Sequence, residues 1–239
     1  MVEKLKSFFL ENKTLTQTVA KNTAWLTIGT IFSRTIRALL ILYAARLLGT
    51  EGYGVFSYAM SLAAFFGIFS DIGLSSLLTR EAVKQPEKIK AYLSTTFFLK
   101  LVILTLTLFV ALVFAPMTVT IMEAKPLIPF AVFLLFFDSF RSFGFSITRA
   151  QNKMEVEAVL SALTDTLIVG ISLAVLFLNP SAWWLSLAYA LGSALGTMVV
   201  FWVIRKYLVG ITQNFDRFLV KPILSSAWPF AIMGMLGPL

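Results

Sequence analysis

The chain of 239 residues contains no cysteine and no histidine. The missing cysteine excludes disulfides and thiol catalysis, and the missing histidine excludes imidazole bases and the usual zinc sites. Charged residues are also scarce, at 13% of the chain, whereas soluble domains carry about 25%. Hydrophobic residues instead make up 58%. This balance indicates an integral membrane protein, for which we expect neither a cofactor nor a metal site.

Apolar runs of about 20 residues, the length that a helix needs to cross the hydrocarbon core, recur along the chain. They predict an all-α, polytopic membrane helix bundle with six spans and the start of a seventh, at residues 22–46, 55–79, 92–115, 127–148, 156–178, 182–204 and from 222 onward.

These runs divide the chain into three expected parts. We expect an amphipathic N-terminal segment over 1–21 on the cytoplasmic surface, a six-helix N-terminal lobe over 22–208, and a cytoplasmic linker with the start of helix seven over 209–239. Because the sequence stops inside the seventh apolar run, most of a second lobe is expected to be missing from it.

The basic residues lie mainly in the joints between spans. Their excess gives a net charge of +8, which would suit a nucleic-acid partner. However, fourteen of the twenty lysines and arginines fall on the side of the N-terminus, and only Arg46 and Lys125 fall on the opposite side. Cytoplasmic loops of membrane proteins carry such an excess. The bias therefore predicts a cytoplasmic N-terminus, a location in the cytoplasmic (inner or plasma) membrane, and no nucleic-acid partner.

Seven ionisable residues interrupt the apolar runs. At ~1.5 Å of rise per residue they lie about 12–23 Å from the cytoplasmic ends of their helices, and so form one layer. Each would cost roughly 3 kcal/mol if it faced lipid at the bilayer centre. We therefore expect all of them to face inward, toward one another or toward a water-filled cavity. They are Arg34, Arg37, Asp71, Lys100, Asp138, Arg141 and Asp165.

One interpretation of this layer is a set of internal ion pairs. Asp138 and Arg141 are three residues apart on one helix and can neutralise each other locally. Asp71 or Asp165 could face the two arginines of the first span. Four cations and three anions leave a surplus of one positive charge.

The other interpretation is a substrate site. Arg34 and Arg37 are like charges three residues apart, so they need an anion between them, and planar guanidinium donors suit a phosphate. Lys100 and Arg141 would add to the same positive site. The candidates to carry a coupling proton or sodium ion, or to pair with these cations, are Asp71, Asp138 and Asp165.

Small and polar residues mark the faces on which helices are expected to meet. The sixth span carries Gly192 and Gly196, a GxxxG step that predicts close helix packing. In the first span, polar residues recur at steps of three and four and so form one stripe, which consists of Thr23, Thr27, Thr30, Arg34 and Arg37.

Four short motifs lie within residues 44–83. They are A-R-L-L-G at 45–49, E-G-Y-G at 51–54, D-I-G-L at 71–74 and T-R-E at 79–81. With these motifs the stretch resembles the signature of the polysaccharide-biosynthesis membrane proteins, the Wzx-type oligosaccharide flippases of the MATE-like MOP exporter superfamily. The resemblance implies export of a sugar chain on a polyprenyl pyrophosphate, by alternating access between two six-helix lobes around a cationic cavity.

The resemblance also implies partners. These are the lipid-linked oligosaccharide, membrane lipid, a coupling H+ or Na+, and proteins of polysaccharide assembly. Arg80 and Glu81, at the cytoplasmic end of the second span, are a candidate gate pair, although simple anchoring by positive charge also explains Arg80.

Two other functions remain open. A MATE-type cation-coupled multidrug exporter would be expected to carry acidic groups in the first span, where this chain has arginines. A non-transporting membrane scaffold would need the charged layer only as ion pairs. No arrangement of nucleophile and base points to an enzyme.

Overall fold

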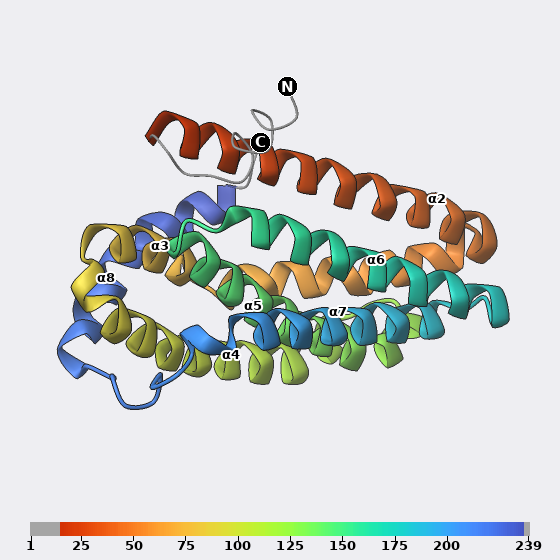
Figure 1. Ribbon diagram of the computed structural model, residues 1–239. Helices are drawn as coiled ribbons and strands as arrows, with labels where there is room; N and C mark the ends of the chain where they lie inside the picture. The colour runs from red at the N-terminus through yellow and green to blue at the C-terminus, as the bar shows by residue number, and fades with distance from the viewer. Residues whose placement is uncertain (1–14, 237–239) are drawn as a thin grey trace, which may run out of the picture.

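The structure is a computed structural model that describes residues 15–236, and these residues form helices joined by short turns (Figure 1). Six long or medium α-helices and one shorter one follow each other along the chain, with three 3-10 turns between them. Their bounds are α2 Leu15–Phe69, α3 Leu74–Lys84, η1 Pro86–Lys88, α4 Ile89–Thr118, η2 Met122–Leu127, α5 Ile128–Ala150, α6 Met154–Leu178, α7 Ala182–Ile204, η3 Arg205–Tyr207 and α8 Arg217–Leu236.

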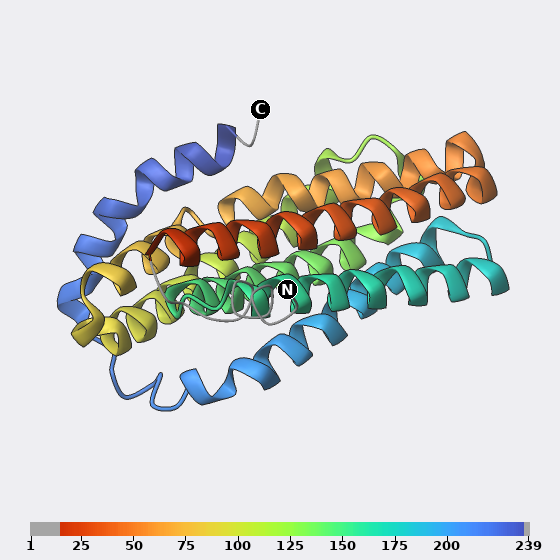
Figure 2. The ribbon, with the colours of Figure 1, turned by 45° about the horizontal axis from the view of Figure 1, so that its top comes forward.

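Helix α2 consists of two arms that meet at Gly49. The backbone of Gly49 has φ 70° and ψ −178°, a conformation that side chains with a Cβ rarely adopt. The chain reverses there, so that the two arms run side by side in opposite directions (Figure 2). The first predicted span, 22–46, therefore lies in the first arm of α2, and the second, 55–79, begins in the second arm. The E-G-Y-G motif follows directly after the bend.

The second predicted span is not continuous, and this part of the prediction was wrong. The helix stops at Phe69 and α3 begins only at Leu74. Between them, Ile72 and Gly73 both have positive φ, 45° and 76°. An apolar run does not reveal such a break, because Asp71 and Gly73 are single residues within an otherwise hydrophobic stretch.

The helices pack into one bundle in which α6 lies between α2 and α7. The GxxxG step makes this close approach feasible, which confirms its interpretation as helix packing. A Cβ added to Gly192 would lie 2.6 Å from the Cα of Ile168 on α6, and one added to Gly196 would clash with Thr164. Glycine is therefore required at both positions for the backbones of α6 and α7 to meet.

The outer surface of the bundle is apolar. Large hydrophobic side chains that are more than half exposed lie along α2 and α4, and they include Ile28, Ile31, Leu39, Leu106 and Phe109. Five helices, with both arms of α2 taken as one, are long and apolar enough to cross a membrane. An exposed hydrophobic belt on such helices is the surface that lipid covers. The chain is thus a multi-pass membrane helix bundle.

The N-terminal segment predicted over 1–21 lies mostly outside the described residues, since these begin at 15. Its described part, from Leu15 to Lys21, belongs to α2 and continues into the first span without interruption. At the other end of the chain, α8 begins before the predicted residue 222 and packs against α3 and α4.

The contact between α6 and α7 gives a test of the fold. Gly192→Ala should lower the free energy of unfolding by about 1–3 kcal/mol, because the new methyl group meets the backbone of Ile168. Gly170→Ala is the matched control, since Gly170 is also helical and a Cβ there meets nothing within 4 Å. Thermal unfolding in detergent would compare the two variants. Equal melting temperatures would contradict the packing described here.

Candidate functional site

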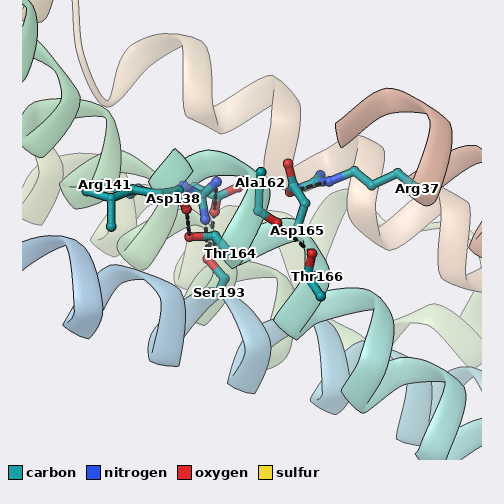
Figure 3. A network of polar contacts seen from close by, with 9 residues as sticks. Arg37, Asp138, Arg141, Ala162, Thr164, Asp165, Thr166 and Ser193 are labelled. Carbon is teal, nitrogen blue, oxygen red and sulfur yellow. Dashed lines mark hydrogen bonds and ion pairs between the residues drawn. The ribbon is translucent and has the colours of Figure 1, made fainter. Parts of the chain in front are cut away.

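The first ion pair of the charged layer joins α2 to α6. Arg37 Nε donates to Asp165 Oδ1 at 2.7 Å, and Arg37 Nη2 lies 2.5 Å from the same oxygen (Figure 3). The side chain of Asp165 is 7% exposed and that of Arg37 is 36% exposed. The carboxylate is therefore almost enclosed by protein, whereas the guanidinium remains reachable from outside. This is one of the pairs that the sequence left open.

The second ion pair lies within α5 and extends to α7. Arg141 Nη2 lies 2.8 Å from Asp138 Oδ1, as their spacing of three residues predicted. Ser193 of α7 joins the pair, because its hydroxyl donates to Asp138 Oδ1 at 2.6 Å and accepts from Arg141 Nη1 at 3.1 Å (Figure 3). A single hydroxyl from the neighbouring helix thus fixes both side chains of the pair.

The third ion pair lies at the break between α2 and α3. Lys100 of α4 is completely buried, and its ammonium pairs with Asp71. Asp71 also accepts from the hydroxyl of Ser75 at 2.6 Å and from the backbone N–H of Ser75 at 3.2 Å. Asp71 therefore satisfies a free N–H at the start of α3, and it does not face the arginines of the first span. The charge of Lys100 is therefore neutralised by Asp71.

Arg34 is the surplus cation. Within residues 15–236 it has no ion-pair or hydrogen-bond partner, and its side chain is exposed on α2. Arg34 therefore does not face the interior of this bundle, and the other expected environment, a water-filled cavity, stays a prediction for it. The reason lies in packing: the buried face of α2 passes through Gly29 and Ser33, and Gly29 lies against Ala158 of α6. Arg34 is one residue, about 100° of helix rotation, away from that face.

The polar stripe of the first span lies on this same exposed side. Thr23, Thr27 and Thr30 are exposed together with Arg34, and only Arg37 at the end of the stripe turns toward the interior. The prediction of one shared face therefore holds for the three threonines and Arg34 but not for Arg37. Three hydroxyls and an unpaired guanidinium thus form a polar strip on a helix that is otherwise covered by apolar side chains.

A cavity of about 250 Å³ lies beside the first two ion pairs. Its polar lining consists of Arg37, Asp138 and the ring of Tyr189, and its remaining walls are apolar. The side chain of Asp138 is 39% exposed, the most of the three aspartates in the layer. The cavity therefore offers one cationic and one anionic group to a small polar ligand or to water.

Two ion pairs at the start of α6 were not predicted from the sequence. Arg149 pairs with Glu157 through Nε at 2.7 Å and through a second nitrogen, and Lys21, which is buried, lies 3.6 Å from Glu155. Both glutamates lie in the first turn of α6, and their position at the start of an apolar run could have indicated these pairs. Their cationic partners were counted only as loop charges.

The candidate gate residues are close together at the surface. Arg80 Nε lies 3.6 Å from Glu81 Oε1, and the Arg80 side chain is 47% exposed. Its guanidinium also lies over the ring of Phe230, 5.9 Å from the ring centre. Arg80 thus connects α3 to α8. Among the described residues, no three carboxylates come together in the way that a metal site needs.

Comparisons with known proteins agree with this architecture. A model of the family of polysaccharide biosynthesis proteins matches residues 19–239. The fold is similar to a solved structure described as the outward-facing conformation of a multidrug resistance MATE family transporter of the MOP superfamily, with a TM-score of 0.68 and 15% identity. The match covers 90% of this chain and 52% of the other, so the chain spans about half the length of that transporter. A search of curated protein sequences gives no match.

The family model covers nearly the whole chain, including the motifs at 45–54 and 71–81 and all of the charged layer. The chain belongs to the polysaccharide biosynthesis protein family.

Proposed function

We propose that this chain forms one lobe of a transporter that moves a polyprenyl-pyrophosphate-linked oligosaccharide across the cytoplasmic membrane. The observation that carries the proposal is Arg34, an arginine on a long apolar helix that has no carboxylate partner among residues 15–236. The other six charges of the layer are neutralised in pairs, so Arg34 supplies the net positive charge that an anionic substrate needs.

The free-energy cost of exposing a charge to lipid favours a hydrated surface around Arg34. A charge that faces lipid at mid-depth costs roughly 3 kcal/mol, and a cavity filled with water removes most of that cost. The threonines of the same stripe fit a wet surface as well. Because the chain spans 52% of the matched transporter, this exposed face of α2 is free to line a central cavity against a second lobe.

The paired cations have different roles in this proposal. Arg37 is one helical turn from Arg34, and its guanidinium is partly exposed, so it can share a pyrophosphate while it holds Asp165. Arg141 is mostly buried and contacts Asp138 and Ser193, and Lys100 is fully buried and pairs with Asp71. We assign these two to positioning the helices, and Arg34 and Arg37 to binding the substrate.

Among the aspartates, Asp138 is the one that lines the cavity and is the best candidate for a coupling proton or sodium ion. Arg80 pairs with Glu81 on α3 and lies over Phe230 of α8, so it links the two helices. Movement of α8 with a second lobe would make or break this link, which would act as a gate at the cytoplasmic end. The bias of lysine and arginine supports a cytoplasmic N-terminus.

Two specific observations favour other functions. The fold match to a multidrug transporter favours drug export, and the pairing of six of the seven charges favours a non-transporting scaffold. The Arg34 variant below separates these functions, because the proposed binding of an anionic substrate is the function that gives this exposed arginine a role.

Arg34→Ala in the full-length transporter should reduce export of the lipid-linked sugar. A charge-assisted contact contributes roughly 1.5–3 kcal/mol, which corresponds to a loss of about ten- to hundredfold. Complementation of export-deficient cells, together with protein level in the membrane, would measure it. Arg46→Ala is the matched control, since Arg46 is another exposed arginine on the first arm of α2. Unchanged export in Arg34→Ala would overturn the substrate assignment.

Arg37→Ala should lower stability as well as export, because it leaves Asp165 enclosed and without its partner. Loss of one member of a buried pair costs 3–5 kcal/mol, and the partial exposure of Arg37 reduces this to about 2 kcal/mol. Adding Asp165→Asn should restore the melting temperature in detergent but not the export. If the double variant regains both, Arg37 serves only as a structural partner.

A further inference from the structure

A second polar pocket lies at the end of the bundle that the charge bias predicts to be cytoplasmic, far along the helices from the charged layer. It has a volume of about 230 Å³ and lies where α4 begins and where α5 and α7 end. The loop between α7 and α8 closes it. Its polar lining consists of Lys90, Gln151, Lys206, Tyr207 and Asn214, and no carboxylate lines it.

The pocket wall formed by the loop is held in place by buried hydroxyls. Ser94 of α4 donates to the carbonyl of Ile211, and the hydroxyl of Thr95 accepts from the backbone N–H of Asp216 at 3.1 Å. Within the loop, Asn214 donates to the carbonyl of Gly210 at 2.8 Å. Both hydroxyl-bearing residues are completely buried. The pocket is therefore preformed by α4 rather than by a loose loop.

The charge around the pocket is positive and uncompensated. Lys90 and Lys206 have no carboxylate partner within residues 15–236. The ring of Tyr207 lies near two ammonium groups, since Lys206 Nζ is 5.1 Å and Lys153 Nζ is 6.0 Å from the ring centre. The carboxylate of Asp216 instead accepts the backbone N–H of Phe218 at 2.8 Å. Three cations from three segments thus lie near the pocket, and none has a carboxylate partner in the described part of the chain.

The surroundings of the pocket have the character of a membrane interface. Trp202, which is 65% exposed, lies under the guanidinium of Arg205 at 5.3 Å, and Val209 in the closing loop is 79% exposed. Exposed tryptophan beside basic residues is typical of the level of the lipid headgroups. Basic pockets between membrane helices on the cytoplasmic side bind phosphate headgroups.

We propose that this pocket binds a phosphate group, which an anionic phospholipid of the adjacent leaflet supplies. Lys90 and Lys206 neutralise the phosphate, and the amides of Gln151 and Asn214 offer hydrogen bonds to its oxygens or to the glycerol. A bound headgroup would fix the loop between α7 and α8, and so the position of α8. This site shares no residue with the proposed substrate site and does not depend on transport.

Native mass spectrometry tests the proposal on the protein as it exists, after reconstitution in equal amounts of phosphatidylglycerol and phosphatidylcholine. The wild-type chain should retain phosphatidylglycerol in preference to phosphatidylcholine. Lys90→Gln with Lys206→Gln should reduce that preference by roughly thirtyfold, since two cations are removed and each cation near the surface contributes about 1 kcal/mol. Lys90→Arg with Lys206→Arg should restore it.

The matched control is Lys88→Gln with Lys221→Gln, which removes the same charge from exposed lysines outside the pocket. An equal loss of preference in this control would mean general attraction of charge and would overturn the site. Unchanged retention of phosphatidylglycerol by the variant Lys90→Gln with Lys206→Gln would overturn the site too. A further arm adds inorganic phosphate. If phosphate displaces the lipid at millimolar levels, the site stands but its source is a soluble anion, which overturns the lipid assignment.

Discussion

The structure depends on the cost of placing a charge inside a membrane. Each ionisable side chain in the helices must be neutralised by a partner or surrounded by water. Three ion pairs meet this requirement, and each of them also fastens parts of the bundle together. Arg37 and Asp165 join α2 to α6, Asp71 and Lys100 join the break after α2 to α4, and the pair within α5 is fixed by Ser193 of α7.

The break between α2 and α3 shows how this requirement shapes the backbone. Non-helical backbone at membrane depth leaves N–H and C=O groups that lipid cannot satisfy. Here the Ser70 N–H bonds the carbonyl of Gly67, and Asp71 accepts the N–H of Ser75. A Cβ on Gly73 would lie 2.6 Å from the carbonyl oxygen of Ala227, so α8 packs directly onto the break. The charge pair, the break and the first helix after the linker are therefore one structural unit.

The two polar features that remain are on surfaces rather than in the core. Arg34 and its threonines lie on the outside of α2, and the lysine-rich pocket lies at the end of the helices. Both have positive charge without an internal partner. The charges of the molecule are thus of two kinds. Paired charges hold helices together, and unpaired charges at the surface remain available to anions.

The sequence by itself determined where the helices lie and which residues must be special. The spans at 92–115, 127–148, 156–178 and 182–204 match α4 to α7 within a few residues, because hydropathy and length decide membrane helices. The pair of Asp138 and Arg141 was also predictable, since its spacing is local. Helical phase correctly placed Arg34 with the threonines of its stripe.

Only the tertiary structure decided which faces meet. Arg37 and Asp165 are 128 residues apart, and phase alone does not say which helix lies opposite. The small residues at 29 and 33 draw α6 onto one side of α2, which turns Arg37 inward and leaves Arg34 outside. The break at 70–73 is likewise stabilised by Lys100 and α8, which come from elsewhere in the chain. Hydropathy reports the affinity of a segment for lipid, whereas pairing depends on distances between segments that only the packed bundle sets.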